Sequence, residues 1–414
     1  MANAFITNDI TTYEALDILE NTYSVAQFIN TEYDDQFTFG GATLGQTLNI
    51  RKPARYLGRL GQAAQIESIL ETSVPLTLSY QRGVDTQVSS QNLKLDIDNY
   101  RKRVLEPQVV RLSNLMDQDV CNLAQGLNNS VGTPGTTPTT LTTYLNAKVK
   151  LDNQAAPADK GRYCAVNPAA DAALMDNLKG LFNNTSQISE QYREGSMKQN
   201  QRTIGFDFEM DQNIFVQTVG TLGGTPTVTT TPANGANTIV TGSWSSTTLN
   251  AGDIISFIST TTPVNVVNPQ NYSNMGVPMQ VVVTANITDS GGAITIPYAP
   301  ALFSSGQLQN VTNMPASGTA IFVYDTPAAN FANISGKSSP QNLAVHKDFG
   351  TLACVDLPLP GGTDIAARAA SRLRGISIRS IRDYISLTDQ WIQRLDVLYG
   401  TAVLRQELGC RVCG

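Results

Sequence analysis

The spacing of apolar residues predicts a long amphipathic helix in the first third of the chain. Pro107 is costly inside a helix but suits its first turn, so the helix is expected to begin near Glu106 and to run for about 20 residues. Six apolar side chains repeat at intervals of three and four residues over this stretch: Val109, Leu112, Met116, Val120, Leu123 and Leu127. This pattern predicts one buried face along what should be the longest helix.

Shorter helices are predicted elsewhere by periodicity and end signals. Thr11 and Glu14 form a capping-box pattern before the apolar residues of 11–30. Asn167 is suited to cap a helix that has Pro168 at its first position and continues to Leu181. Residues 144–151 and 363–373 also have helical patterns.

Other stretches have the alternation and the β-branched content of strands. Residues 31–97, which include TLNIRKPARY (47–56), suggest extended β-hairpin material on an exposed arm. The segment RYCAV (162–166) reads as a short buried strand. Further strand-like runs are 204–214, 342–350, 351–359, 375–382 and 390–399.

Charge nearly disappears from one long stretch of the chain. Residues 212–336 contain no Lys, Arg or Glu, and their only charged residues are Asp253, Asp289 and Asp325. Short β-branched runs alternate there with Gly, Pro and Asn, which suggests a β-barrel or sandwich large enough to fold as a domain. We therefore predict an α/β body split by an all-β insertion, whose two edges must lie close together.

The composition argues against several protein classes. The 414 residues carry a net charge of −6, whereas a dedicated nucleic-acid binder normally has a basic footprint. No apolar run reaches the length of a membrane span, and the N-terminus does not resemble a secretory signal. A cytoplasmic protein without membrane contact is expected. The five cysteines do not suggest a disulfide framework, and we interpret the Cys410-x-x-Cys413 spacing as incidental.

The residues of catalytic chemistry are sparse. His346 is the only histidine, and its apolar surroundings favour a structural placement over catalysis. No phosphate-binding loop is present, because GTLGGT (220–225) lacks the lysine and the following helix. Arginines at 368, 372, 374, 379 and 382 form the densest basic run, which could bind nucleic acid but more simply forms salt bridges. We predict no enzyme activity, no catalytic residues, no cofactor and no metal.

The order of several motifs resembles one protein family over nearly the whole chain. The motifs are TLNIRKPARY, LKLDIDNYRKRVLEPQVVRLSNLMDQDVCNLAQ, GRYCAVNPAADAALMDNLKGLF, YREGSMKQNQRTIGFDF, AGDIISF and LDVLYGTAVLRQELGCRV. In this order they resemble the major capsid (coat) proteins of tailed double-stranded DNA bacteriophages, which have the Hong Kong 97 fold. The resemblance is greatest to the coat protein of short-tailed Salmonella phages, which carries an inserted β-barrel called the I-domain.

The resemblance implies an α+β chain with a defined domain order. The expected parts are an N-arm (1–34), an E-loop (35–97), a P-domain spine helix (98–139), the first part of an A-domain (140–212), an inserted barrel (213–336) and an A/P-domain C-terminal part (337–414). It also favours a loop with helical turns, rather than a helix, at 363–373.

The implied function is that of a major capsid protein in the virion, assembled in the bacterial cytoplasm. Its expected partners are copies of itself as hexamers and pentamers, a scaffolding protein and a portal protein, with non-specific proximity to packaged DNA. Inter-subunit contact candidates, chosen by their place in the arm, at the spine start or in the A-domain loop, are Arg82, Arg101, Arg103, Tyr192 and Arg193. For each, a solvated or intrachain-paired role is about equally expected.

One alternative is a non-enzymatic binding protein that uses its Thr-rich β-domain to attach to a ligand or a surface. That alternative predicts a secretion route and a soluble monomer, and the sequence shows no signal peptide.

Overall fold

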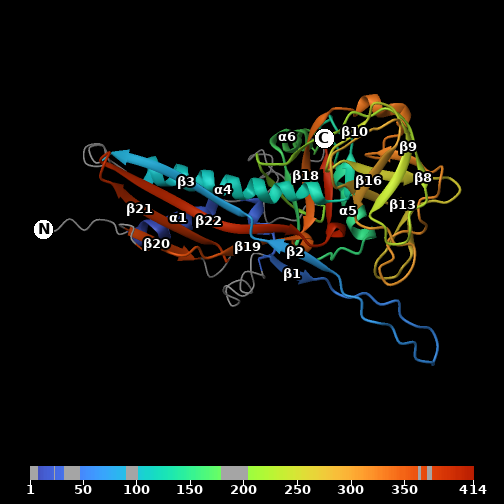
Figure 1. Cartoon of the computed structure of the whole chain (residues 1–414), viewed down its shortest axis with the longest axis horizontal. Coiled ribbons are helices and arrows are strands. Elements are labelled where there is room, and N and C mark those ends of the chain that lie inside the picture. Colours follow the sequence, from blue (N-terminus) through green and yellow to red (C-terminus); the bar gives the residue numbers. More distant parts are fainter. Residues whose placement is uncertain are drawn as a thin grey trace. The chain divides into compact units, whose positions relative to one another are not determined.

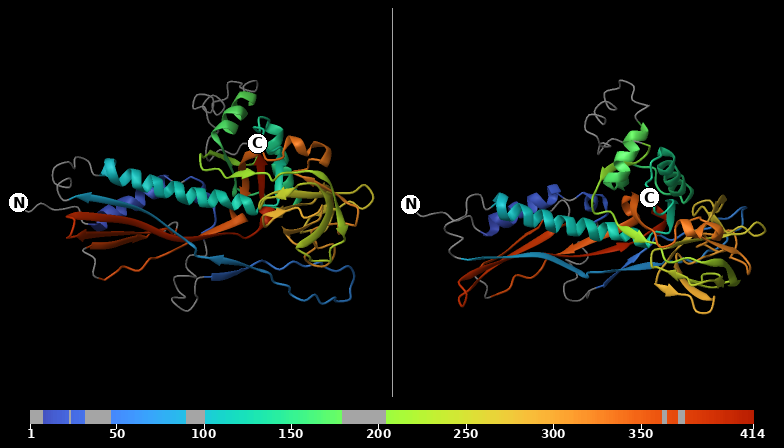
Figure 2. Two further views of the ribbon diagram at one scale, coloured as in Figure 1. Left: turned by 45° about the horizontal axis from the view of Figure 1, so that its top comes forward. Right: turned by 90° about the horizontal axis from the view of Figure 1, so that it is seen from above.

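The computed structural model describes residues 8–22, 24–31, 47–89, 101–178, 204–361, 365–370 and 375–414. The chain forms two compact units, each built from three separated segments (Figures 1 and 2). The first unit comprises Met1–Ile50, Val74–Val120 and Gly350–Ala402, and the second comprises Arg51–Ser73, Cys121–Phe349 and Val403–Gly414. Both helices and sheets are present, so the predicted α+β class is confirmed.

The first unit contains a five-stranded sheet in the order β19-β22-β21-β20, with β3 also paired to β22. The pairs of β3 with β22, β22 with β21 and β21 with β20 are antiparallel. Helix α1 contacts β20 and β21. The element bounds are α1 Asn8–Thr22, a 3-10 turn Val25–Phe28, β1 Thr47–Arg51, β2 Ser73–Thr77, β3 Tyr80–Ser89, α4 Glu106–Cys121, β19 Gly350–Val355, β20 Ile365–Ala370, β21 Ser377–Ile385 and β22 Gln390–Val403.

Helix α4 begins at Glu106, as predicted, and runs beside β3 (Figures 1 and 2). A π-helical turn, Arg101–Leu105, precedes it, and a 3-10 turn, Asn122–Gly126, follows it. The predicted stripe is buried except for the half-buried Leu123, and Leu112 and Met116 are fully inaccessible to solvent. The α-helix has 16 residues and ends at Cys121, so it is shorter than the predicted 20 or so. The helix therefore forms because one apolar face is covered while its other positions stay polar.

The second unit contains a mixed sheet in the order β4-β23-β18-β5-β6, and β7 pairs with β18 outside this path. Strand β23 is parallel to β4 and β5 is parallel to β6, whereas β18 is antiparallel to both of its neighbours. All five residues of β23 are buried. The bounds are β4 Asn129–Gly132, α5 Leu141–Asn153, β5 Arg162–Val166, α6 Pro168–Leu178, β6 Asp207–Met210, β7 Val216–Thr218, β18 Ser338–His346, the 3-10 turns Ala328–Asn333, Lys347–Phe349 and Gln406–Leu408, and β23 Gly409–Cys413.

The predicted N-cap of α6 is present, since the backbone N–H of Ala170 donates to Asn167 Oδ1 at 3.0 Å. Replacing Asn167 with alanine is expected to lower the free energy of unfolding by about 1 kcal/mol, because one N-terminal amide of the helix loses its acceptor. Urea denaturation followed by circular dichroism measures this loss. An Asn167→Asp variant should retain most of the stability, because aspartate is an equally good cap. Equal losses in both variants would contradict a capping role.

The charge-poor stretch forms a closed six-stranded barrel in the order β11-β14-β16-β9-β8-β17 (Figure 1). Its interior is filled by aliphatic and aromatic side chains, including Phe257, Val281 and Ile296. Closure pairs every barrel strand on both sides and leaves no free edge, which protects a nearly uncharged module from edge-to-edge aggregation. The bounds are β8 Gly224–Thr230, β9 Thr238–Trp244, β10 Thr248–Leu249, β11 Ile254–Ile258, β12 Asn265–Val267, β13 Asn274–Pro278, β14 Gln280–Val283, β15 Ile287–Thr288, β16 Ile294–Ala299 and β17 Ala320–Val323.

The two edges of the insertion lie side by side, as predicted. Strand β7 pairs with the start of β18, with Gln217 opposite Ser339. The backbone N–H of Val219 donates to Lys337 O at 2.9 Å, which continues the ladder toward the barrel. The chain thus leaves the body through β7 and returns to it through the start of β18, and we call this pair of strands the neck.

Three local predictions need correction. Residues 365–370 form strand β20, and neither the helix that their pattern predicts nor the loop with helical turns that the resemblance implies. Each of them pairs with β21, and this tertiary pairing overrides the Ala-rich helical propensity. The N-terminal helix α1 spans Asn8–Thr22, so Thr11 lies inside it and not at a capping box, and the helix ends before residue 30. A short 3-10 turn follows at Val25–Phe28. Only Asp207–Met210 is a strand within 204–214.

Candidate functional site

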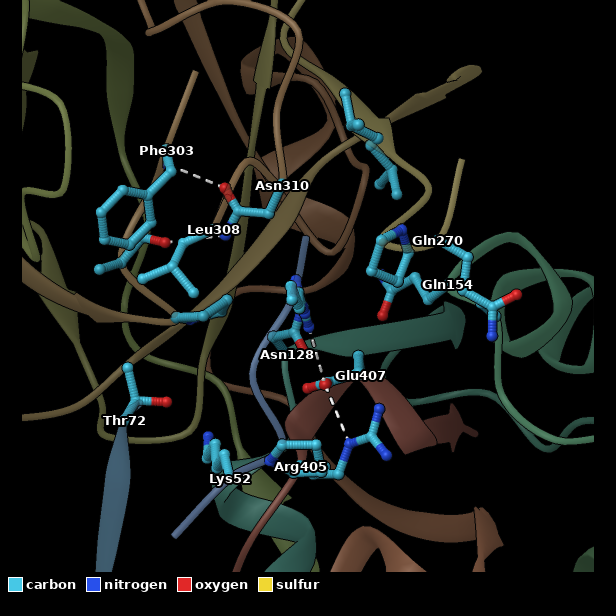
Figure 3. Close-up of a pocket in the computed structure, with 18 of the residues that line it drawn as sticks. Lys52, Thr72, Asn128, Gln154, Gln270, Phe303, Leu308, Asn310, Arg405 and Glu407 are labelled. Atoms are coloured by element: carbon cyan, nitrogen blue, oxygen red, sulfur yellow. Dashed lines mark hydrogen bonds and ion pairs between the residues drawn. The ribbon is translucent and has the colours of Figure 1, made fainter. Parts of the chain in front are cut away.

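A cavity of about 420 Å³ opens in the second unit where four parts of the chain meet (Figure 3). Segment 52–55 and Thr72 line one side, and Asn128 and Gln154 line another. Barrel residues between 266 and 310 form a third wall, and Arg405 and Glu407 complete the lining. Distant segments therefore create the cavity only when the unit is folded.

Four charged side chains gather in this cavity, which we call the cationic cavity: Lys52, Arg55, Arg405 and Glu407. Glu407 Oε1 accepts hydrogen bonds from Arg55 Nη2 and from Arg405 Nε, each at 3.2 Å. Figure 3 shows Arg405 and Glu407 side by side, with Lys52 on the same side of the cavity. Three cations thus surround one carboxylate, which gives the lining a formal charge of +2.

The closeness of these charges changes the pKa of both Glu407 and Lys52. Burial by itself would raise the pKa of Glu407, but Arg405, its own backbone N–H, Arg55 and Lys52 outweigh burial and lower it. Burial lowers the pKa of Lys52, Glu407 offsets part of this change, and Arg405 and Arg55 lower the pKa further. The carboxylate is therefore held ionised, while the ammonium of Lys52 lies in an environment that disfavours its charge.

The remaining walls are apolar or carry amides. Asn310 is fixed by its own contacts, with Oδ1 accepting from the Phe303 N–H at 2.8 Å. Asn128 donates from Nδ2 to Gln280 O at 3.0 Å, while its Oδ1 is buried and has no hydrogen-bond partner. Phe303 and Leu308 lie opposite the charged side (Figure 3). The arrangement suits binding, because it combines a charged side with apolar walls.

Within the described ranges, no three His, Cys, Asp or Glu side chains gather in a way that could hold a metal ion. The cavity lining contains no cysteine, serine or histidine. Its charged side chains and amides can recognise a ligand by charge and hydrogen bonds.

Replacing Glu407 with glutamine should lower stability in a pH-dependent way. The folded pKa of Glu407 lies below its unfolded value of roughly 4.3, so its contribution is complete above about pH 5 and is lost as pH falls through the folded pKa. We expect the variant to be less stable than the wild type by about 1–2 kcal/mol at pH 7, and this difference to narrow near pH 3. Urea denaturation of both proteins at the two pH values measures it. A difference that stays constant with pH would contradict the ion-pair role.

Of the five predicted contact residues, Arg82 and Arg103 have described side chains, and neither lines the cavity. Arg82 forms a two-point ion pair within the first unit, with Nε 2.9 Å from Asp119 Oδ2 and Nη2 2.7 Å from Asp119 Oδ1. Arg103 is exposed in the π-helical turn before α4, and Arg101 begins that turn, although its side chain lies outside the described residues. Tyr192 and Arg193 also lie outside them. An inter-subunit role for all five therefore stays a prediction.

Sequence reasoning missed the cavity. The available signal was a cluster of cations, Arg51 to Arg55, whose partner Glu407 lies more than 350 positions away. No local pattern connects two such segments, because their proximity depends on the fold.

The single histidine and the paired cysteines have structural surroundings. His346 is buried in β18, with Nε2 2.9 Å from Asp159 Oδ1. Cys410 and Cys413 are free and buried, and burial raises the pKa of the Cys410 thiol to about 12. Cys413 Sγ donates to Gln341 Oε1 at 2.9 Å. These contacts agree with the structural interpretation of His346 and the incidental one of the C-x-x-C spacing.

Among the described helices, none combines the length and the apolar character needed to cross a membrane.

Comparison with known proteins gives one family match and several fold similarities. Residues 54–414 match the family model described as P22 coat protein, gene protein 5. No curated protein matches the chain. The fold is similar to that of a Mycobacterium phage Che8 chain (TM-score 0.45, 10% identity, covering 94% of this chain and 90% of that one). It is also similar to the capsid of cyanophage P-SCSP1u (TM-score 0.42, 11% identity, 89% and 83%) and to a virus-like particle from Pyrococcus furiosus (TM-score 0.35, 10% identity, 97% and 97%).

Proposed function

Because the chain belongs to the P22 coat protein family, we propose that it is the major capsid protein of a tailed double-stranded DNA phage and that its copies build the icosahedral shell. The observation that carries this proposal is the family match, which extends from residue 54 to residue 414. Membership of a coat protein family also supports the Hong Kong 97-type fold expected from the sequence motifs.

The physical properties of the chain suit a protein that is packed in many copies. The barrel is closed, so its strands offer no edge to neighbouring barrels at high local concentration. The neck joins the barrel to the body without interrupting the body sheet. The acidic net charge limits unspecific adhesion to DNA that lies close to the shell.

We also propose the assembly partners and the domain scheme of the subunit. The subunits would form hexamers and pentamers in the bacterial cytoplasm, with a scaffolding protein and a portal protein as partners and with packaged DNA nearby. The domain scheme of an N-arm, an E-loop, a spine helix, an A-domain and an inserted barrel at 213–336 applies to this chain as part of the proposal. Arg101, Arg103, Tyr192 and Arg193 are the first positions to test for contacts between subunits, and Arg82 follows because it already pairs with Asp119.

Electron microscopy and sedimentation of the protein expressed in bacteria test the proposal, with and without a co-expressed scaffolding protein. We expect closed shells, or tubes and sheets of capsomers, in at least one of the two conditions. A product that is strictly monomeric in both conditions would contradict self-assembly as the function.

A further inference from the structure

We propose that the cationic cavity binds a small organic dianion, such as a phosphate monoester that also carries hydroxyl groups. The inference starts from charge. Lys52, Arg55 and Arg405 face one carboxylate, Glu407, so the lining carries a formal excess of two positive charges in a protein whose net charge is −6. A ligand with two negative charges would neutralise this excess.

The three cationic side chains have N–H groups that are still available to a ligand. Among the residues that the structure describes, the ammonium of Lys52 makes no hydrogen bond and no ion pair. Arg405 uses only Nε on Glu407, and Arg55 uses only Nη2, so the other guanidinium nitrogens have no partner in the same part of the chain. Guanidinium groups match the oxygens of a phosphate or a carboxylate in geometry as well as in charge.

A further carboxylate of segment 51–73, Glu67, is already engaged by other groups. Glu67 accepts from the N–H groups of Leu57 and Gly58, both at 2.9 Å, and from Gln307 Nε2 at 3.1 Å. It is also absent from the cavity lining. Among the residues that the structure describes, no further carboxylate completes the charge balance of the cationic cavity.

The uncharged walls indicate what the rest of the ligand is like. The volume of about 420 Å³ lies in the range of small-molecule sites and exceeds the needs of an inorganic phosphate ion. Phe303, Leu308 and Met279 offer apolar surface for an organic body. Gln270 also lines the cavity and is exposed, so its side-chain amide can hydrogen-bond a ligand hydroxyl or amino group.

Isothermal titration calorimetry of the unassembled full-length chain with adenosine monophosphate at low salt tests the proposal. This probe carries a phosphate dianion, hydroxyl groups and a flat ring. Lys52→Gln and Arg405→Gln should each weaken binding by about tenfold or more, because each removes a charge-assisted contact. Glu407→Gln should strengthen binding, because it raises the positive excess. If these residues had a purely structural role, the substitutions would not change the affinity for the probe in opposite directions.

A matched control is Lys160→Gln, which removes the same charge from an exposed lysine outside the cavity lining and should leave the affinity unchanged. Competition by inorganic phosphate should weaken binding of the probe, which would assign the charged side to the phosphate group. The proposal is overturned if the probe fails to bind the wild type, or if it binds all four variants and the wild type equally. Binding of duplex DNA without binding of the nucleotide would also overturn it. Thermal unfolding of each variant verifies that it is folded.

Discussion

Replacing Asp253 with alanine is expected to lower the free energy of unfolding of the second unit by about 4 kcal/mol. Asp253 is completely buried at the base of the barrel. Its Oδ2 accepts from the N–H groups of Asn250 at 2.8 Å and Gly220 at 3.1 Å, and its Oδ1 accepts from Gln217 Nε2 at 3.1 Å. The substitution leaves the N–H groups of Asn250 and Gly220 without this acceptor in a dry environment, where each unsatisfied group is costly, whereas Gln217 Nε2 keeps Thr218 O and Ala251 O as acceptors.

A buried arginine increases this cost. Arg411 on β23 is fully buried, donates from Nη2 to Gly252 O at 2.8 Å, and has no hydrogen-bond partner for Nε or Nη1. The charge of Asp253 acts on this guanidinium, because the effect of Arg411 on the pKa of Asp253 is downward while burial raises that pKa. Without the carboxylate, the buried positive charge of Arg411 loses its nearby counter-charge.

Urea denaturation measures the loss, with the fluorescence of Trp244 in the barrel as the signal and Trp391 replaced by phenylalanine. Asp289→Ala is the matched control, because Asp289 is a half-buried aspartate of the same barrel that accepts from the Gly292 N–H. We expect it to cost less than about 1 kcal/mol. Adding Arg411→Met to Asp253→Ala should recover part of the stability. Equal effects of Asp253→Ala and Asp289→Ala would contradict the network.

The second large effect is expected at Asp119, where alanine should lower the free energy of unfolding of the first unit by about 3 kcal/mol. Asp119 Oδ2 accepts from the buried Tyr399 hydroxyl at 2.6 Å, and both carboxylate oxygens accept from Arg82. The carboxylate on α4 therefore fastens the helix to β22 and β3 at once. Its removal leaves a buried hydroxyl and a half-exposed guanidinium without their acceptor.

Urea denaturation with Trp391 as the fluorescent group measures this loss. Asp85→Ala is the control on β3, because Asp85 is largely exposed and lies 4.0 Å from Arg394, so the change should stay within about 0.5 kcal/mol. Arg82→Ala should lower the free energy of unfolding of the unassembled chain by about 1 kcal/mol. A double-mutant cycle should show that the effects of Arg82→Ala and Asp119→Ala are coupled. If Arg82→Ala changes assembly alone and leaves the subunit's stability intact, the residue acts between subunits instead.

Local patterns predicted those elements whose cause is local. The stripe of α4 follows from helical periodicity, and the cap at Asn167 follows from the sequence of three residues. The join between body and insertion was predictable for another reason, because a chain that leaves a fold and returns to it must do both at neighbouring points.

Elements set by distant partners were not predictable. Residues 365–370 are strand because β21 supplies the ladder, and their own alanines give no sign of it. The cationic cavity depends on Glu407 meeting Arg55, a contact that no spacing rule describes. Likewise, the sequence places Arg82 on an arm, but only the folded unit shows its pairing with Asp119.

The position of β23 in its sheet constrains when the body can fold during synthesis. Residues 409–413 lie between β4 and β18, so the ribosome makes this central strand after all the other strands of the sheet. Until then, β4 and β18 each lack a neighbour and expose a strand edge. The barrel strands lie between residues 224 and 323, so the barrel can close before β23 is synthesised and completes the sheet of the body. A nascent chain should therefore pass through a stage with a finished barrel on an open body, the stage at which a chaperone has most surface to bind.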